Sequence, residues 1–382
     1  MSPNPRSARV AILGAGIIGL ACAWELVQRG ARVTLYDTQT PGRGASWAAA
    51  GMLAPAFEAA AEEGAHPRLF DLCMESAALW PGFAASVSQA SGRDLGFSPG
   101  PSLALAFDGA EAAGLHRLSA ALTRHGVGSD MLLPEAVWDI EPAVSRGVHG
   151  ALMLPTDGQV DNRAIVAALI AALGEHEGVR FVTAPAPLED RDGRLGIEGH
   201  DMILAAAGWN TAAIKVRQHG EEFSLVNWDT SLDEIDCYGG QMLSVSREQG
   251  LPTMTVRCGS IYIAPKPDRV IIGATMEPGK ATLEPDADTI AGLRAEAARL
   301  CPAIAHAPEL ETWAGVRPGT LDHAPLIGRT RAEGLFVASG HYRNGILLAP
   351  VTAKIMADRM LDGKTSELAA AFSPARFAAA TA

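Results

Sequence analysis

The sequence is poor in cysteine and has no long apolar run, and each absence excludes a class of protein. Five of its 382 residues are cysteines; they are widely spaced and never form a CxxC pair. This odd, scattered set is typical of a reduced cytoplasmic protein, so we expect neither a disulfide framework nor a metal site. The apolar run over residues 164–173 predicts a buried helix, because a membrane span takes roughly 18 or more such residues. We therefore expect a cytoplasmic protein without a membrane partner.

Positive charge is also scarce. The chain has 31 lysines and arginines against 43 aspartates and glutamates, which gives a net charge of -12 at pH 7. Nucleic acids and anionic membrane surfaces are bound by basic patches, so this balance argues against both kinds of partner. With 48% hydrophobic and 19% charged residues the chain can bury a full core, and its length favours two domains.

The first 40 residues have the pattern of a βαβ unit. Apolar strands are predicted over residues 9–13 and 31–37, with a helix over 17–29 between them. A GxGxxG motif separates the first strand from the helix. Its glycines allow a tight turn, close approach of backbone amides to a pyrophosphate, and close packing of the helix on the strand. The three glycines are Gly14, Gly16 and Gly19.

Asp37 supports the prediction of a dinucleotide ligand. It ends the second strand 18 residues after Gly19, where a carboxylate can accept hydrogen bonds from both ribose hydroxyls. Two features favour FAD over NAD: the small-residue strand end at residues 204–208 and the loop over 39–55, for which no helix is expected. Small residues in this loop allow a flat ring system against the backbone, and Ser46 can reach the pyrophosphate.

Segments of α/β character alternate with β-rich segments along the chain. We therefore predict an α/β fold, in which a Rossmann-like FAD-binding domain with the GxGxxG motif is interrupted twice by an antiparallel-sheet substrate-binding domain. The expected FAD-binding domain comprises residues 1–90, 151–215 and 317–382, and the expected substrate-binding domain comprises 91–150 and 216–316.

Four longer motifs occur along the chain: SWAAAGMLAP (46–55), YIAPKPDRVIIGATMEPG (262–279), WAGVRPGTLDHAPLIG (313–328) and GHYRNGILLAP (340–350). Together they resemble the glycine oxidase (ThiO) branch of the FAD-dependent D-amino-acid oxidase (DAO) family. Their order and spacing are those of the family, and the resemblance covers nearly the whole chain. It lapses between Lys215 and Tyr238, where YGGQ stands in place of a basic residue before GQ.

The resemblance implies roles for five residues of a substrate site. Arg317 matches an arginine whose planar fork binds the substrate carboxylate, and Tyr262 matches a tyrosine whose hydroxyl reaches the same group. Met276 and Met52 match methionines that line the pocket, and Arg343 matches an arginine at the boundary of flavin and substrate. By strand pattern alone Tyr262 is more readily a core residue, and ordinary core packing accounts for the methionines nearly as well.

Residues expected to contact FAD lie in the Gly-rich turn, at the end of the second strand, in the loop that follows, near the strand over 202–208 and in the turn after residue 340. They are Gly14, Gly16, Ile17, Ile18, Gly19, Asp37, Thr38, Ala45, Ser46, Ala50, Gly51, Met52, Ala186, Ala207, Gly208, His341, Arg343, Asn344, Gly345, Ile346 and Leu347. Some relatives attach FAD through a cysteine before the last strand. Because no cysteine follows Cys301, we expect FAD to be bound non-covalently.

The resemblance implies oxidative deamination of glycine and other small amino acids or amines, such as sarcosine and D-alanine. Hydride transfer to the flavin would give an imine or 2-oxo acid and ammonia, and molecular oxygen would be reduced to hydrogen peroxide. The family pathway is the assembly of the thiamine thiazole, and a homotetramer is a common state. Alternatives are a related dehydrogenase that uses another electron acceptor, an oxidase for a specialised amine, and a nucleotide-binding module without catalysis.

Overall fold

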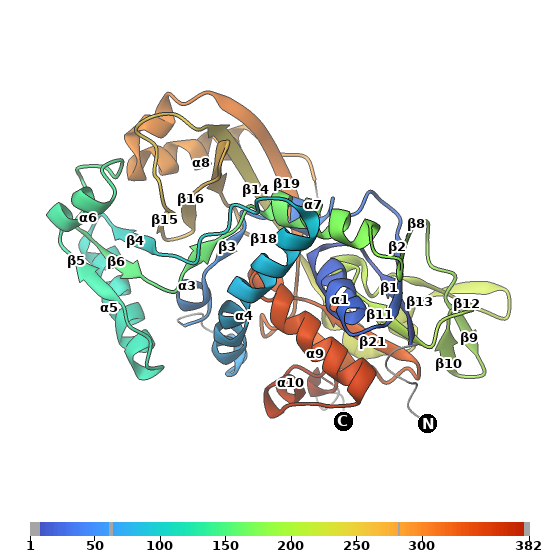
Figure 1. Cartoon of the computed structure of the whole chain (residues 1–382). Helices are drawn as coiled ribbons and strands as arrows, with labels where there is room; N and C mark the ends of the chain where they lie inside the picture. Colours follow the sequence, from blue (N-terminus) through green and yellow to red (C-terminus); the bar gives the residue numbers. More distant parts are fainter. Residues whose placement is uncertain (1–7, 61–63, 282, 378–382) are drawn as a thin grey trace.

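The computed structural model describes residues 8–60, 64–281 and 283–377. Within these residues the chain builds one mainly parallel and one mainly antiparallel large sheet. In Figure 1 the parallel sheet lies on the right and most antiparallel strands lie on the left, with the chain passing between them several times. The α/β fold expected from the sequence is confirmed.

The parallel sheet has six strands among the described residues, in the order β20–β21–β11–β1–β2–β8, and β20 is antiparallel to β21. Helices share its core, and its inner strands β1, β11 and β21 are mostly apolar. The strands are β1 (Arg9–Leu13), β2 (Arg32–Asp37), β8 (Val179–Thr183), β11 (Met202–Ala205), β20 (Leu326–Arg329) and β21 (Leu335–Ser339). The helices are α1 (Ile17–Gln28), α4 (Leu69–Ser91), α7 (Asn162–Gly174) and α9 (Ala349–Asp362).

The antiparallel sheet has nine strands among the described residues. Eight follow the order β18–β14–β17–β16–β15–β4–β6–β5, and the ninth, β19, pairs with β14. They are β4 (Ser102–Ala106), β5 (Asp130–Leu132), β6 (Gly150–Leu154), β14 (Asp236–Ser246), β15 (Val256–Cys258), β16 (Ile261–Pro265), β17 (Arg269–Gly273), β18 (Glu277–Pro278) and β19 (Glu309–Gly319). One face packs on α8 (Ala287–Leu300) in a second apolar core. The connections include α5 (Gly109–Arg124) and α6 (Pro134–Ile140).

Shorter elements join these sheets. A four-stranded sheet contains β9 (Glu189–Arg191), β10 (Arg194–Gly196), β12 (Lys215–Gln218) and β13 (Glu221–Ser224), and a small ladder pairs β3 (Met52–Leu53) with β7 (Gly158–Gln159). The short helices are α2 (Ala45–Ala48), α3 (Pro55–Ala59), α10 (Glu367–Ala371), η2 (Gly208–Asn210), η3 (Leu225–Asn227), η4 (Thr230–Glu234), η5 (Pro302–Ala305), η6 (Tyr342–Asn344) and η7 (Pro374–Phe377).

The expectation of no helix over residues 39–55 was wrong. The segment contains α2, β3 and the start of α3. Contacts with distant segments support these short pieces, because Asn162 Nδ2 donates to the carbonyls of Ser46 and Trp47 and β3 pairs with β7. A four-residue helix is too short to show periodicity, so the sequence pattern alone could not indicate it.

The division into two domains remains a proposal, and strand pairing conflicts with it at two boundaries. Strand β6 pairs with β4 and β5, although 151–215 was assigned to the FAD-binding domain. Strand β12 pairs with β9, and Val216 and Leu225 share an apolar core with Leu13 of β1, although 216–316 was assigned to the substrate-binding domain. Strand pairing therefore assigns residues 151–154 to the substrate-binding domain and residues 216–225 to the FAD-binding domain.

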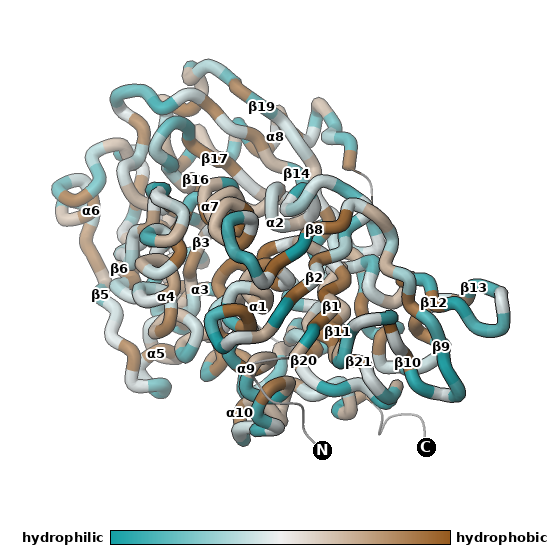
Figure 2. Tube along the Cα trace, turned by 45° about the vertical axis from the view of Figure 1, so that its right-hand side comes forward, coloured by the Kyte–Doolittle hydropathy of each residue, from teal (hydrophilic) through white to brown (hydrophobic). Residues whose placement is uncertain are grey.

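Hydropathy along the chain follows this layering. Figure 2 shows hydrophobic colour concentrated on β1 and α1, and hydrophilic colour on the β9–β10 and β12–β13 hairpins. None of the helices in the described part of the chain is both long and apolar enough to cross a bilayer.

Candidate active site

A cavity of about 980 Å³ extends from the Gly-rich turn after β1 to the antiparallel sheet at β14, β16 and β19. All the residues predicted for the site line it except two, Gly19 and Leu347. The lining therefore brings together the Gly-rich turn, the loop around Ser46, the turn after residue 340, and the proposed carboxylate-binding residues Arg317 and Tyr262.

Two glycines of the GxGxxG motif act through close packing. Gly14 has φ +113°, and a Cβ there would lie 2.7 Å from the carbonyl carbon of Ala206. A Cβ on Gly19 would clash with the carbonyl group of Gly14, so Gly19 allows α1 to approach β1 closely, as expected for the third glycine. Gly19 thus shapes the turn from behind and does not line the cavity.

Asp37 and Ser46 hold this end of the cavity in place. The Asp37 carboxylate accepts from the Ala15 N–H (2.8 Å) and the Gln39 N–H (2.9 Å), so it ties the Gly-rich turn to the residues after β2. Ser46 Oγ accepts from the Ile17 N–H at 2.8 Å, in the first turn of α1. Each oxygen retains acceptor capacity, because a carboxylate or hydroxyl oxygen has a second lone pair.

The turn after β21 is fixed by buried polar contacts. His341 Nε2 lies 3.0 Å from Thr352 Oγ1 of α9, and burial lowers the pKa of His341 to about 3, so the imidazole is neutral. The carbonyl of Asn344 accepts from the Leu348 N–H. Helix α9 begins at Ala349 with Pro350 in its first turn, where a missing N–H costs little.

Asn344 provides the clearest test of whether this cavity fits a cofactor. Its side chain is buried, lines the cavity, and leaves Nδ2 without a hydrogen-bond partner among the described residues. An unsatisfied buried donor costs about 1–3 kcal/mol, so an acceptor on a bound molecule would be favoured here. The ring edge of FAD offers carbonyl and ring-nitrogen acceptors, and the residues present therefore fit it.

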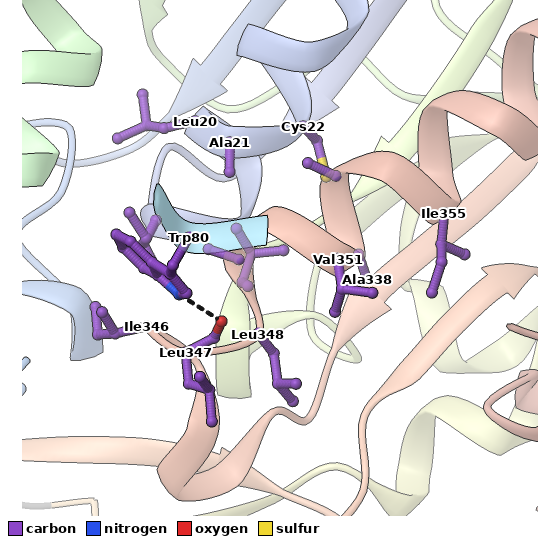
Figure 3. Close-up of a cluster of buried hydrophobic side chains, with 14 of the residues drawn as sticks. Leu20, Ala21, Cys22, Trp80, Ala338, Ile346, Leu347, Leu348, Val351 and Ile355 are labelled. Atoms are coloured by element: carbon purple, nitrogen blue, oxygen red, sulfur yellow. Dashed lines mark hydrogen bonds between the residues drawn. The ribbon is translucent and has the colours of Figure 1, made fainter. Parts of the chain in front are cut away.

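Leu347 was predicted to contact FAD, but its position is different. Figure 3 shows the Leu347 carbonyl accepting from Trp80 Nε1, at 2.8 Å, within a cluster of buried hydrophobic side chains. Ser76 Oγ donates to the same carbonyl at 2.6 Å. Leu347 therefore anchors the turn to α4 and does not line the cavity.

At the other end of the cavity, Arg317 and Tyr262 approach each other over the antiparallel sheet. Arg317 Nη1 donates to the carbonyls of Gly239 (3.2 Å) and Thr275 (3.3 Å), and no described acidic side chain forms an ion pair with it. Burial lowers the pKa of Arg317 and raises the pKa of Tyr262, whose hydroxyl donates to Met242 Sδ at 3.0 Å. A half-buried cation without an acidic partner among the described residues favours an anionic ligand.

Sequence reasoning missed a buried acid beside these residues. Glu58 of α3 lines the cavity, with Oε1 3.0 Å from Arg257 Nη1 and Oε2 2.8 Å from Arg343 Nη2. Arg343 is thus held at the cavity wall by a carboxylate, which its motif did not reveal. The available signals were an acid in an otherwise apolar stretch, APAFEAAA (54–61), and, far along the chain, an arginine within the strand VRC (256–258).

The two methionines have distinct environments. Met52 Sδ accepts from Arg257 Nη2 at 3.2 Å, so Met52 contacts the arginine that forms an ion pair with Glu58. Met276 is 37% exposed and accepts from the Tyr342 hydroxyl at 3.4 Å, which places it at the rim and not in the core. Further lining residues that the sequence did not indicate include Tyr36, Trp47, Glu58, Trp209, Met242 and Trp313.

Comparison with known proteins identifies the family of this chain. The family model for FAD dependent oxidoreductase (DAO) matches residues 9–359. The glycine oxidase of Geobacillus kaustophilus is 32% identical over 377 residues, which cover 96% of each chain. A crystal structure of that enzyme superposes on this chain with a TM-score of 0.85 and 30% identity, covering 97% of this chain and 99% of the other. The bifunctional protein ThiO/ThiG of Trichormus variabilis is 32% identical over 96% of this chain but 55% of its own length, so the chain spans about half of that relative. This chain belongs to the DAO family of FAD-dependent oxidoreductases, and FAD is its cofactor.

Proposed function

We propose that this enzyme oxidises the amine of glycine and other small amino acids, with sarcosine and D-alanine as further candidate substrates. The observation that supports it most is Arg317, a guanidinium in the cavity wall with no acidic partner among the described residues. A planar fork of donors fits a carboxylate, and Tyr262 supplies a hydroxyl on the same sheet face. Relatives named glycine oxidase support the same interpretation.

FAD, when bound, supplies the two-electron acceptor, which oxygen regenerates with release of hydrogen peroxide. Arg317 and Tyr262 would hold the substrate carboxylate and so fix the position of the amine in the same cavity as Asn344, where the ring edge of FAD would bind. Arg343, paired with Glu58, adds a fixed positive charge beside the substrate.

No lining side chain in the described part of the chain is placed as a general base. Both oxygens of Glu58 face arginines, His341 is bonded to Thr352, and Asp37 lies at the Gly-rich end. Burial raises the pKa of Tyr262, so this residue stays a donor. The substrate ammonium would therefore lose a proton to water and bind as the neutral amine. Loss of the Cα hydride to the two-electron acceptor would then leave an iminium, which water hydrolyses to ammonia and a 2-oxo acid.

The proposal extends to the setting of the enzyme. We infer non-covalent FAD, a cytoplasmic location and a homo-oligomeric, tetrameric state, with the imine also consumed in thiazole assembly for thiamine. Relatives whose names join ThiO to ThiG support that last role.

The test is hydrogen peroxide release from glycine, sarcosine and D-alanine by the purified, yellow, FAD-loaded protein. Release of FAD on acid treatment of a separate sample tests whether the cofactor is bound non-covalently. Peroxide formed in step with amine oxidation is the expected result. Reduction of an artificial electron acceptor without peroxide would instead indicate a dehydrogenase, and no turnover of any of the three would reject the proposed substrates.

A further inference from the structure

Arg317 and Tyr262 come from strands that are not neighbours. Strand β19 pairs with β14, β14 pairs with β17, and β17 pairs with β16, so two strands separate the arginine from the tyrosine. Adjacent strands lie about 4.8 Å apart, which puts the two backbones roughly 14 Å from each other. The side chains must therefore extend over the intervening strands to bind one small carboxylate together.

The intervening positions that they cover are glycines. Tyr262, Gly273 and Met242 form one cross-strand row, and Gly240 lies two residues before Met242 on β14, so all face the same side of the sheet. Arg317, opposite Tyr238, lies on that same face. Gly240 thus lies beneath the guanidinium, and Gly273 lies beneath the phenol.

The fit of each pair leaves no room for a side chain. A Cβ on Gly240 would lie 2.6 Å from Arg317 Nη2 and 2.7 Å from its Cζ. A Cβ on Gly273 would lie 2.5 Å from the Tyr262 hydroxyl oxygen and 2.7 Å from its Cζ. Cβ atoms do not approach heavy atoms below 3.0 Å, so an alanine at either position would force the overlying side chain to move.

A left-handed backbone does not account for these glycines. Neither Gly240 nor Gly273 is among the residues with positive φ. Glycine within a strand costs about 0.5–1 kcal/mol relative to alanine, since it loses more entropy and packs no side chain. Close approach of another group is a further reason for glycine within a strand, and the short contacts at Gly240 and Gly273 are of this kind.

We propose that Gly240 and Gly273 are positioning residues of the substrate site. Their bare backbone forms a floor on which Arg317 and Tyr262 lie flat and converge on the substrate carboxylate. The inference rests on the proposed function, because it takes Arg317 as the group that binds the carboxylate.

The test is Gly240→Ala in the FAD-loaded enzyme, compared with Gly196→Ala, a strand glycine of β10 where an added Cβ would have no atom within 4 Å. Gly240→Ala should raise the KM for glycine roughly 10- to 100-fold, which is the range expected when a hydrogen bond to a charged group is lost. It should also weaken the binding of acetate, measured by competition with glycine, by a similar factor. Gly196→Ala should leave both values within about twofold. Unchanged KM and acetate affinity in Gly240→Ala would overturn the inference.

A double-mutant cycle separates this role from general damage. In an Arg317→Met background the alanine has no guanidinium to displace, so Gly240→Ala should cause little further loss of acetate affinity or of thermal stability. Should Gly240→Ala alone fail to fold, folding of the double variant would still support the inference, and failure of both would contradict it. If Arg317→Met itself leaves glycine KM unchanged, the proposed function fails, whatever Gly240→Ala shows.

Discussion

Glu58 should be the most sensitive single side chain for the stability of this site. Its carboxylate is 6% exposed and contacts Arg257, which is 2% exposed, and Arg343, which is 31% exposed. In Glu58→Gln the negative charge is lost while both arginines remain. The Arg257 guanidinium would then be a buried charge without an ion pair, and only the longer-range attraction of Asp157 would remain.

The expected magnitude follows from these exposures. Removing one partner of a buried ion pair costs about 3–5 kcal/mol, whereas a pair that is nearly a third exposed contributes about 0–1 kcal/mol. Glutamine keeps one acceptor oxygen for Arg257, which favours the lower end. We therefore expect Glu58→Gln to lower the free energy of unfolding by about 3 kcal/mol, mainly through Arg257.

Urea unfolding of the FAD-loaded protein would measure this change. Glu333→Gln is the matched control, because its ion pair with Arg194 is 58% exposed on both sides and should contribute about 1 kcal/mol or less. Combining Glu58→Gln with Arg257→Met should recover part of the loss, since it removes the unpaired charge. A loss in Glu58→Gln no larger than that in Glu333→Gln would refute the reasoning.

Three further changes test other parts of the structure. Lys266 donates to Gln159 Oε1 and the Val160 carbonyl, and burial lowers its pKa to about 7. Between pH 7 and about 10.4 the unfolded chain therefore holds a proton that the folded protein has released, so the free energy of unfolding of the wild type should rise with pH, relative to Lys266→Met, by about 1 kcal/mol per pH unit. An equal difference between the two proteins in urea unfolding at pH 7 and pH 9 would contradict this. Ser46→Ala removes the acceptor of the Ile17 N–H and should cost about 1 kcal/mol and weaken FAD binding in a fluorescence titration of apoprotein; unchanged FAD affinity would argue against a cofactor-supporting role. Trp80→Phe removes one of two donors to the Leu347 carbonyl and should cost about 1 kcal/mol in thermal unfolding, and no loss would show that Ser76 alone suffices.

Features encoded by local sequence were predictable. The GxGxxG turn and the strand that ends at Asp37 each depend on a few consecutive residues, and both were placed correctly. The position of Arg317 and Tyr262 on one cavity wall followed from the family resemblance, because their strand pattern alone indicated a core aromatic and an ordinary arginine.

Features that depend on distant partners were not predictable from one sequence. The Leu347 carbonyl turns towards Trp80 and Ser76, which lie some 270 positions earlier, and nothing in GHYRNGILLAP indicates that direction. Glu58 lies in an alanine-rich stretch where an acid usually faces water, and its two arginines come from separate strands and turns. The glycine floor at Gly240 became visible only once the register of β14 and β19 was known.

The most direct test of the account is the kinetics of Arg317→Met with glycine, using FAD-loaded enzyme and peroxide detection. The account predicts that kcat/KM falls by at least about 100-fold, because the carboxylate loses its charged, two-donor partner while FAD content stays the same. Arg317→Lys should recover only part of this loss, since an ammonium lacks the planar fork. An Arg317→Met enzyme with unchanged kcat/KM for glycine would contradict the central claim that this arginine binds the substrate carboxylate.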